Sequence, residues 1–306
     1  MQDVEAAIAH RGWVAESHHR ARVVVTNPDG GVRLLLGDTA PATLPRSALK
    51  PFQVIAMLRS GLDLDGELLA LAGASHWGEQ FHRDGARAIL AGAGLSEADL
   101  GNTADFPLDE ASRIAWIRDG HGKEPLAHNC SGKHAAMLRT CVRAGWSTDG
   151  YRDPAHPLQQ AVRATIDEYC GVIGEPVVDG CTAPAFACAL AGLARGFGAW
   201  ALAEGEAERR IYRAYHEHPA YMSGSDDRTV VFVTQIEGLV MKLGAEGILA
   251  AALPDGTGIA VKMSDGMGRG RFEVMAAVLG ALGYPIVGLT AEVEIAPELS
   301  DALQGL

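Results

Sequence analysis

A serine and a lysine three residues apart form the most chemically suggestive pattern in this sequence. Ser47 and Lys50 lie in the segment R-S-A-L-K-P-F-Q, and this spacing places both on one face of a helix. A serine hydroxyl becomes an effective nucleophile only when a base removes its proton, and a lysine amine is a base only when it is neutral. Burial or a nearby positive charge favours the neutral amine. The pair therefore predicts nucleophilic catalysis, although a helix cap followed by a solvated lysine gives the same pattern.

Two further segments place polar residues where elements are expected to end. Ser75 stands with His76, Glu79 and His82 in A-S-H-W-G-E-Q-F-H, directly after an apolar segment. Catalytic residues often occupy such loops, but so do merely solvated side chains. Lys262 interrupts the apolar strand pattern of I-A-V-K-M-S-D-G. A lysine in such a strand is costly to bury unless it is paired or neutral, so we expect it at a rim or in a functional role.

The cysteines offer possible metal ligands. Cys130 and Lys133 are three residues apart in H-N-C-S-G-K-H, and Cys181 lies in V-D-G-C-T-A-P. Two thiolates can bind zinc, but the usual C-x-x-C and H-x-x-x-H spacings are missing, and buried cysteines without any metal are common. The chain has 5 cysteines at irregular spacing and no secretory pattern in its first residues, so we expect free thiols and a cytoplasmic location.

Composition narrows the class of protein. The chain has 306 residues, of which 48% are hydrophobic and 21% charged, as in an ordinary globular protein. We expect one domain over residues 1–306, with two intimate lobes as a variant. The net charge of -12 disfavours nucleic acid and anionic membranes as partners, and no apolar stretch is long enough to span a bilayer. A small molecule is the expected partner.

Hydrophobic periodicity predicts strands at both chain ends and helices between them. A hairpin is expected over residues 21–37, and a second one over 248–253 and 259–263, each with a Gly- and Pro-containing turn. Helical spacing covers residues 52–62, 86–93, 158–169 and 184–202, whereas residues 228–236 fit a strand or a helix equally well. These elements predict an α+β fold, layered in the α/β sense, with a sheet from both chain ends and a mostly helical middle.

Taken in order, the segments resemble the bacterial L-asparaginase II family of the Rhizobium etli type. The matching pieces span residues 14–266: V-A-E-S-H-H-R, P-R-S-A-L-K-P-F-Q, A-S-H-W-G-E-Q-F-H, N-C-S-G-K-H-A-A-M-L, H-P-L-Q, V-D-G-C-T-A-P, K-L-G-A-E-G-I and I-A-V-K-M-S-D-G. The resemblance implies a fold like that of serine β-lactamases and penicillin-binding proteins, hydrolysis of L-asparagine to L-aspartate and ammonia, and a homodimer. The Ser-x-x-Lys pattern is shared with those enzymes.

The same resemblance implies roles for particular residues. It pairs Ser47 with Lys50 and Ser75 with Lys262, and it assigns zinc to Cys130, Lys133 and Cys181. Asp179 would hold the zinc site or the substrate's amino group, His134 would stand beside it, and Arg46 is a candidate for the substrate α-carboxylate. Ser47 would attack the amide with Lys50 as base, while Ser75 and Lys262 relay protons. Which of the two serines becomes acylated is left open.

Other functions fit the same residues. A related amidase could act on glutamine, another β-amide or a β-lactam, and a non-catalytic protein of this fold could bind a small ligand or a metal. The chain has no T-G-G-T signature and no obvious autoprocessing threonine, which disfavours the other asparaginase designs. It also departs from the family pattern: M-S-G-S-D-D-R-T replaces a glycine-rich segment, and Thr182 stands where a glycine is usual. We expect these loop changes to affect substrate range more than fold.

Overall fold

The centre of the molecule is a seven-stranded sheet to which both ends of the chain contribute. The computed structural model describes residues 3–289 and 293–306. The N-terminal part supplies β1 (Val4–Arg11), β2 (Val14–Thr26) and β3 (Val32–Leu36), and the C-terminal part supplies β6 (Val240–Gly244), β7 (Ile248–Ala252), β8 (Gly258–Met263) and β9 (Val293–Ile295). The strand order is β6-β7-β8-β2-β1-β9, with β3 paired to β2, and the pairs are antiparallel. Both predicted hairpins are confirmed.

Helices fill the middle of the chain, as expected. After a short 3₁₀ turn, η1 (Arg46–Leu49), the order is α1 (Lys50–Arg59), α2 (Gly66–Ala72), α3 (Gln80–Ala91), η2 (Glu97–Asp99), α4 (Glu110–Arg118), α5 (Ser131–Ala144) and α6 (Pro157–Cys170). A small sheet, β4 (Ile173–Val178) with β5 (Pro184–Ala187), precedes α7 (Leu190–Leu202), α8 (Glu206–Glu217), α9 (Pro219–Met222) and α10 (Arg228–Gln235). The C-terminal helices are α11 (Arg271–Ala281) and α12 (Pro297–Leu303).

Two expectations about local structure need correction or completion. The predicted helix over residues 184–202 is wrong in its first part, because Pro184 and Ala185 pair with β4 and the helix begins only at Leu190. The ambiguous segment at residues 228–236 is the helix α10. The Asp227 carboxylate accepts a hydrogen bond from the Thr229 amide at 2.7 Å, so this N-cap stabilises a helix despite the β-branched content.

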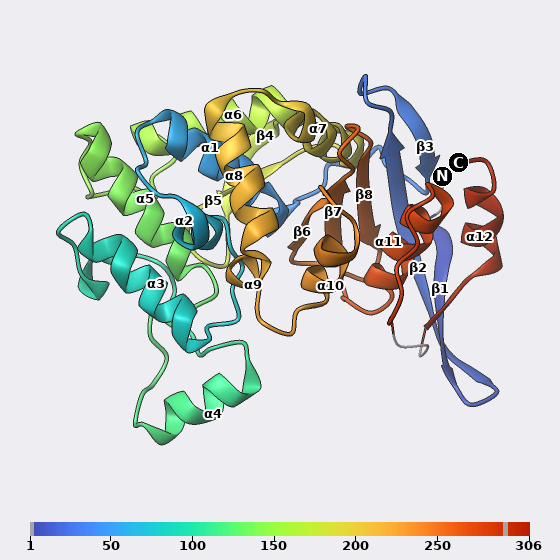
Figure 1. The fold of residues 1–306 in the computed structure, drawn as a ribbon, viewed down its shortest axis with the longest axis horizontal. Coiled ribbons are helices and arrows are strands. Elements are labelled where there is room, and N and C mark those ends of the chain that lie inside the picture. The colour runs from blue at the N-terminus through green and yellow to red at the C-terminus, as the bar shows by residue number, and fades with distance from the viewer. Residues whose placement is uncertain (1–2, 290–292) are drawn as a thin grey trace.

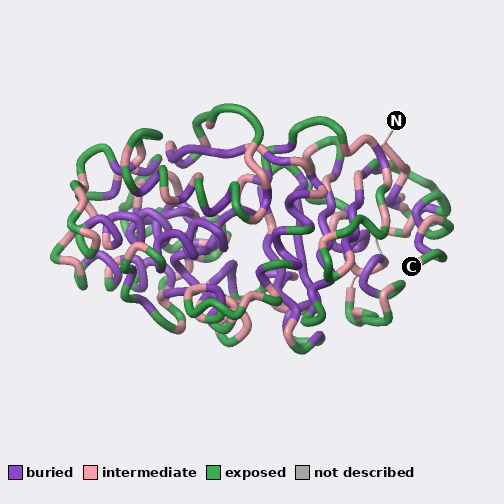
Figure 2. Tube along the Cα trace, turned by 90° about the horizontal axis from the view of Figure 1, so that it is seen from above, coloured by how far each residue is buried: buried purple, intermediate pink, exposed green. Residues whose placement is uncertain are grey.

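Each face of the sheet is the wall of a separate apolar core. Alternate residues of β2, β7 and β8 point to opposite sides, so Val24, Ala250 and Ala260 join the helices of the middle segment. Val25, Leu249 and Val261 join α10, α11 and α12 on the other side. Figure 1 shows the helical middle on one side of the sheet and α11 and α12 on the other, with the two termini close together. Buried residues, purple in Figure 2, occur in both the helical middle and the sheet.

The sheet and the helical lobe meet at a short connection. η1 packs against β6, and the approach is so close that a Cβ at Gly244 would lie 2.2 Å from the Pro45 carbonyl oxygen. α7 lies against β7 and β8 and connects the two parts. No helix in the described part of the chain is both long and apolar enough to cross a membrane. The fold therefore brings the Ser47 turn directly to the edge strand β6.

Candidate active site

Ser47 lies in the turn that joins the sheet to the helical lobe. It is part of η1, and Arg46 before it has a left-handed φ of 53°, a strained value for a residue with a side chain. Ser47 is partly exposed and lines a cavity of about 290 Å³, together with Arg46, His128, Cys130, Asp179 and Cys181. The cavity is about the size that a single amino acid requires, so Ser47 is accessible to a small substrate.

Ser75 is held on the opposite side of the same region by backbone hydrogen bonds. It follows α2, and its amide donates to the Met222 carbonyl at 3.1 Å. The next two amides, of His76 and Trp77, donate to the carbonyls of Asn129 and Ser223 at 3.1 Å and 2.7 Å. This short extended segment is therefore fixed between two others, and Ser75 is buried with 5% of its surface exposed. Its position is set by the backbone rather than by side-chain packing alone.

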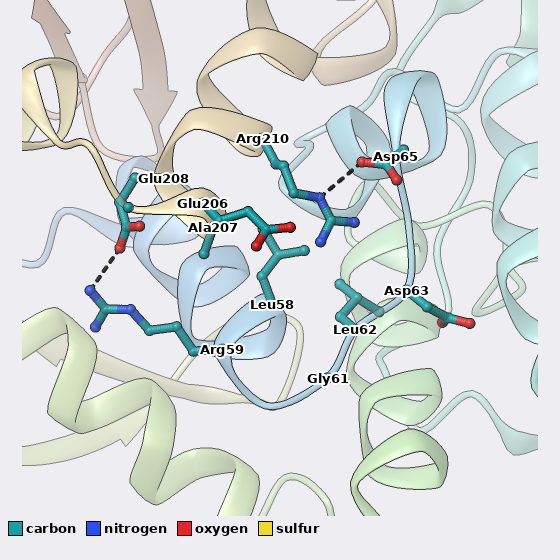
Figure 3. Close-up of a pocket in the computed structure, with 11 residues that line it drawn as sticks. Leu58, Arg59, Gly61, Leu62, Asp63, Asp65, Glu206, Ala207, Glu208 and Arg210 are labelled. Carbon is teal, nitrogen blue, oxygen red and sulfur yellow. Dashed lines mark hydrogen bonds and ion pairs between the residues drawn. The ribbon is translucent and has the colours of Figure 1, made fainter.

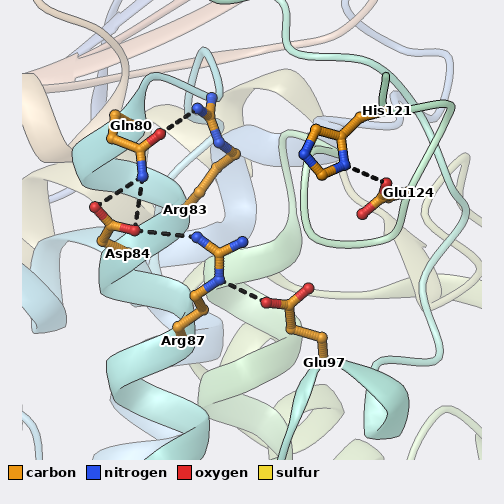
Figure 4. Close-up of polar contacts among 7 residues, drawn as sticks. All are labelled: Gln80, Arg83, Asp84, Arg87, Glu97, His121 and Glu124. Atoms are coloured by element: carbon orange, nitrogen blue, oxygen red, sulfur yellow. Dashed lines mark hydrogen bonds and ion pairs between the residues drawn. The ribbon is translucent and has the colours of Figure 1, made fainter. Parts of the chain in front are cut away.

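The α3 helix supports this loop through a buried arginine. Arg83 donates to the Gly78 carbonyl and to the Gln80 side chain, and its guanidinium lies 4.8 Å from the centre of the Trp116 ring. Figure 4 shows Arg83 and Arg87 among the polar contacts that join α3 to its surroundings. Gly78 itself has a φ of +77°, and a Cβ there would lie 2.9 Å from Cα of Pro107. The loop that carries Ser75 is thus clamped at its far end.

Lys50 contacts Ser75 rather than Ser47. Its ammonium donates to Ser75 Oγ at 3.0 Å, to Cys130 Sγ at 3.1 Å and to the Ala74 carbonyl. An ammonium has three N–H donors, so these three acceptors use all of them. The Ser47–Lys50 pair expected from the sequence lies on adjacent turns, but the hydrogen-bond partner of this lysine is the second serine. A charged Lys50 has no lone pair to accept a proton, so Lys50 can serve as a base for Ser47 only in its neutral form.

A second buried lysine, Lys242 of β6, completes the network. Its amine lies 3.2 Å from Ser75 Oγ and 3.0 Å from the Leu243 carbonyl oxygen. Burial first, and then the charge of Lys50, hold the pKa of Lys242 well below its ordinary value of 10.5. A neutral Lys242 can accept a hydrogen bond from the Ser75 hydroxyl while Lys50 donates to the same oxygen. Lys50, Ser75 and Lys242 therefore form a continuous chain of hydrogen bonds.

The structure does not bring Lys262 to Ser75. Lys262 of β8 donates to the Met263 carbonyl at 2.6 Å and pairs across the sheet with Arg22 and Ile248. Lys242 pairs with Ala250. The two lysines share a sheet face, but β7 lies between their strands. Ala260 of β8 is level with Lys242, and Lys262 is two residues further along, so the two lysine Cα atoms are about 12 Å apart. The expected Ser75–Lys262 pairing needs correction to Ser75–Lys242, since strand register decides which lysine reaches the serine.

The expected metal ligands do come together. Lys133 Nζ lies 3.1 Å from Cys181 Sγ, and all three residues are buried. A hydrogen bond with Cys181, and then the charges of Lys50 and Lys133, lower the pKa of Cys130 well below 9.0 although burial opposes this. Burial lowers the pKa of Lys133, but the charges on Cys181 and Cys130 outweigh it and raise that pKa. Two sulfur ligands and an amine that loses its proton on binding suit zinc, so the residues fit this metal.

The described residues contain no cluster made up only of the usual metal-ligating side chains. Within residues 3–289 and 293–306, no group of three or more His, Cys, Asp or Glu side chains could hold a metal ion. The Cys130, Lys133 and Cys181 set differs from such a cluster because one of its members is a lysine. His134 lies next to it in sequence, and its buried Nε2 atom has no hydrogen-bond partner among the described residues. All five cysteines have free thiols, as expected.

The remaining expected residues line or adjoin the Ser47 cavity. Arg46 binds Asp179, with Nε and one terminal nitrogen 2.7 Å and 2.5 Å from the same carboxylate oxygen. Burial raises the pKa of Asp179, but the positive charges of Lys133 and Arg46 lower it overall, so the carboxylate is ionised. His134 donates to or accepts from the Tyr151 hydroxyl at 2.7 Å, and burial lowers its pKa to about 4. A negative and a positive group therefore stand side by side at the mouth of the cavity.

Sequence analysis missed three residues of this site. Lys242 stands in K-L-G-A-E-G-I, a segment that carried the family resemblance, so an inward lysine in a strand was a usable signal there. His128, whose ring accepts the Cys130 amide at 3.0 Å, and Asn129, whose carbonyl accepts the His76 amide at 3.1 Å, gave no signal of their own. Thr182 adopts a left-handed φ of 70° where the family pattern has glycine, which explains why glycine is usual there.

A larger cavity elsewhere has no comparable chemistry. It measures about 730 Å³ and lies between α1, the start of α2 and α8. Figure 3 shows four of its charged side chains bound in two pairs: Arg59 to Glu208 at 2.7 Å, and Arg210 to Asp65 at 2.9 Å. Ion pairs of this kind hold helices together and leave few groups for a ligand. The serine–lysine region is the better candidate despite its smaller volume.

Comparison with known proteins identifies the class. The L-asparaginase II family model matches residues 7–296, and the chain belongs to that family. The suspected family is thereby confirmed. A search of curated proteins found no match.

Solved structures show partial likeness. A β-lactamase from Mycobacterium bovis is 16% identical with a TM-score of 0.48, covering 85% of this chain and 94% of its own. EstCE1, a hydrolase with promiscuous acyltransferase activity, is 12% identical with a TM-score of 0.44, covering 83% and 92%. The protein Mglu is 16% identical with a TM-score of 0.40, covering 89% and 69%. The family assignment rests on the family model, and the mixed α/β fold class on the structure itself.

Proposed function

We propose that this protein hydrolyses the side-chain amide of L-asparagine to L-aspartate and ammonia. The observation that carries the proposal is the Lys50–Ser75–Lys242 network, buried directly beside a cavity that contains a second, accessible serine. Two lysines on one serine oxygen are costly to bury, and such an arrangement is typical of proton transfer rather than of structural support. Family membership supports an amidohydrolase of this kind.

Ser47 is the proposed nucleophile, since it is the serine that the amino-acid-sized cavity exposes. Its oxygen attacks the amide carbonyl, and its proton passes to Lys50 in the neutral state. Lys50 contacts Ser75, so the proton continues to Ser75 and from there to the departing nitrogen, with Lys242 as the second base. Ammonia leaves, and water hydrolyses the aspartyl ester by the same path in reverse.

Arg46 and Asp179 are proposed to bind the amino-acid end of the substrate. The ionised Asp179 suits the α-ammonium group, and the Arg46 guanidinium suits the α-carboxylate. The backbone amides of Ser47 and Ala245 have no acceptor in the described part of the chain, and both residues line the cavity. These two amides are candidates for the donors that stabilise the oxyanion. A pair of donors on adjoining segments is what a tetrahedral intermediate requires.

Zinc is proposed to bind Cys130, Lys133 and Cys181. A bound Zn²⁺ would supply a fixed positive charge at the wall of the cavity that Cys130 and Cys181 line. The homodimer implied by the family resemblance is likewise a proposal, which light scattering of the purified protein would test.

The test compares wild-type protein with Ser47→Ala for ammonia release from L-asparagine and L-glutamine. Asparagine-dependent release that falls at least 100-fold in the variant supports the proposal. Release from glutamine alone identifies a related amidase. A rise in melting temperature with asparagine, but no ammonia, would instead identify a binding protein. Ser47→Ala with unchanged turnover would contradict the assignment of the nucleophile.

A further inference from the structure

A second cavity adjoins the first on the side of Ser75. It has a volume of about 380 Å³ and is lined by Ser75, Trp77, Leu108, Asn129, Asp227 and Phe272, among others. We infer that this cavity receives a substituent carried on the amide nitrogen, so that the substrates include secondary β-amides of aspartate with an apolar nitrogen substituent. The inference rests on the proposed function, whose reaction it extends from a primary to a secondary amide.

The two cavities are placed on either side of the proposed scissile bond. Asn129 lines both of them, Ser47 lines the first and Ser75 lines the second. If Ser47 attacks the carbonyl carbon and Ser75 delivers the proton to nitrogen, the acyl half occupies the first cavity. The nitrogen then faces the second. Anything attached to that nitrogen extends past Ser75 into the second cavity.

The second cavity is much larger than ammonia needs. Ammonia is about the size of a water molecule, whose share of the liquid is roughly 30 Å³. The cavity has more than ten times that volume, at about 380 Å³. Space of this size beside the leaving group is unnecessary for asparagine, and it admits a ring or a branched chain.

The walls favour an apolar substituent. Trp77 and Phe272 contribute aromatic rings, and Leu108 is an apolar side chain with 47% of its surface exposed. Three charged neighbours have partners in the protein: Arg228 with Glu273 at 2.7 Å, Asp227 with the Thr229 amide at 2.7 Å, and one terminal nitrogen of Arg271 with the Gly244 carbonyl at 3.2 Å. The Arg271 Nε atom has no partner among the described residues, and Asp226 is exposed. The apolar part of the wall, formed by Trp77, Leu108, Leu243 and Phe272, is the surface that an apolar substituent would contact.

The segment over residues 222–229 forms part of this cavity. M-S-G-S-D-D-R-T contributes Asp226, Asp227 and Arg228 to the lining. It is held in place by Glu79, whose carboxylate accepts the Ser225 amide and hydroxyl at 2.8 Å and 2.7 Å. Gly224 lies against the Trp77 ring, where a Cβ would come within 2.4 Å. This segment therefore shapes the leaving-group side of the site.

The reaction on such a substrate balances as it does for asparagine. Ser47 Oγ forms the new ester bond, the C–N bond breaks, and the serine proton is transferred through Lys50 and Ser75 to the nitrogen. The primary amine leaves in place of ammonia, and water then releases L-aspartate. No oxidant, reductant or further co-reactant enters the step.

The test measures L-aspartate, the product common to both substrates, from N4-benzyl-L-asparagine and from L-asparagine. We expect kcat/KM for the benzyl amide to be at least one tenth of that for asparagine. A smaller value overturns the inference but leaves the proposed function standing. No L-aspartate from either compound means that the proposed function fails, and the inference fails with it.

A pair of variants tests the location. Leu108→Glu introduces a charge into the cavity, and we expect it to lower the benzyl-to-asparagine ratio of kcat/KM at least fivefold. Ile114→Glu is the matched control, because Ile114 has a similar exposed fraction of 50% on α4 and does not line the cavity. This control should leave both rates unchanged. A ratio that Leu108→Glu leaves unaltered overturns the placement and the inference.

Discussion

Lys242, and not the expected Lys262, contacts Ser75, and this contact leads to a specific prediction. Lys242→Met replaces a buried amine with an apolar side chain of similar length and removes the contact at 3.2 Å from Ser75 Oγ. Loss of a positioned base lowers turnover by about 10² to 10⁴, or roughly 2.7–5.5 kcal/mol of transition-state free energy. We therefore expect kcat for asparagine to fall at least 100-fold.

Lys262→Met is the matched control on the neighbouring part of the sheet. Its amine is bound to the Met263 carbonyl, and its Cα is about 12 Å from that of Lys242 by strand geometry. Removing one charge at about 12 Å in an aqueous dielectric changes the interaction by roughly 0.35 kcal/mol, less than twofold in rate. Lys242→Arg should not restore activity, because a guanidinium stays charged and cannot accept a proton.

The assay is steady-state ammonia release by all three variants, with melting temperatures to confirm that each is folded. We expect Lys242→Met to stay folded, since it replaces a buried polar group with an apolar one of similar volume. The reasoning would be refuted if Lys262→Met lowered kcat/KM 100-fold while Lys242→Met kept a third or more of the wild-type kcat/KM. That result would return the second pair to Ser75 and Lys262.

Three further predictions concern stability and metal. Burial lowers the pKa of His82 from 6.5 to about 4. Between pH 6.5 and pH 4 the unfolded chain therefore binds a proton that the folded chain does not. The free energy of unfolding falls with falling pH in this range, by up to about 1.4 kcal/mol per pH unit. Urea titrations of wild type and His82→Phe at pH 7 and 5 measure this, and an unchanged slope in the variant would contradict it. Gly78→Ala should lower the free energy of unfolding by about 2–4 kcal/mol, because the added Cβ meets Pro107 at 2.9 Å. Gly94→Ala, also at positive φ but in open space, should lower it by only about 1 kcal/mol. Equal losses of stability in thermal unfolding would show that the clash is relieved. Purified protein should carry about one zinc ion per chain by elemental analysis. Cys181→Ser should lower the zinc affinity at least tenfold, whereas Cys141→Ser, which changes a buried thiol on α5, should leave it unchanged. Equal zinc content in all three proteins would argue against the site.

Some features of the site follow from local patterns alone. The turn residues around Asp29 and Gly30 and around Asp255 and Gly256 fix two hairpins whatever else surrounds them. The Ser-x-x-Lys spacing predicted a helix around Ser47 and Lys50, and η1 and α1 lie there. These predictions held because they depend on residues within one turn or one hairpin.

The segment over residues 184–202 shows where local pattern fails. Its apolar spacing fits a helix throughout, yet Pro184 and Ala185 pair with Val178 and Val177 of β4, because residues 179–183 form a turn that folds the two strands together. The reverse happened at residues 228–235, where Asp227 caps a helix although valine and threonine favour a strand. In both cases a contact outside the repeating pattern decides the outcome.

The sequence by itself determined the chemical inventory: two serines, buried-type lysines on strands, and a cysteine–lysine set in motifs of one family. Tertiary structure alone decided which members meet. Lys242 and Lys262 both interrupt apolar strands and face the same side of the sheet, so no local pattern separates them. Strand order places β6 at the edge beside the Ser47 turn and β8 two strands away, and this register joins Ser75 to Lys242. Ser75 and Lys242 are 167 residues apart in sequence, so only the folded molecule brings the Lys242 amine to 3.2 Å from Ser75 Oγ.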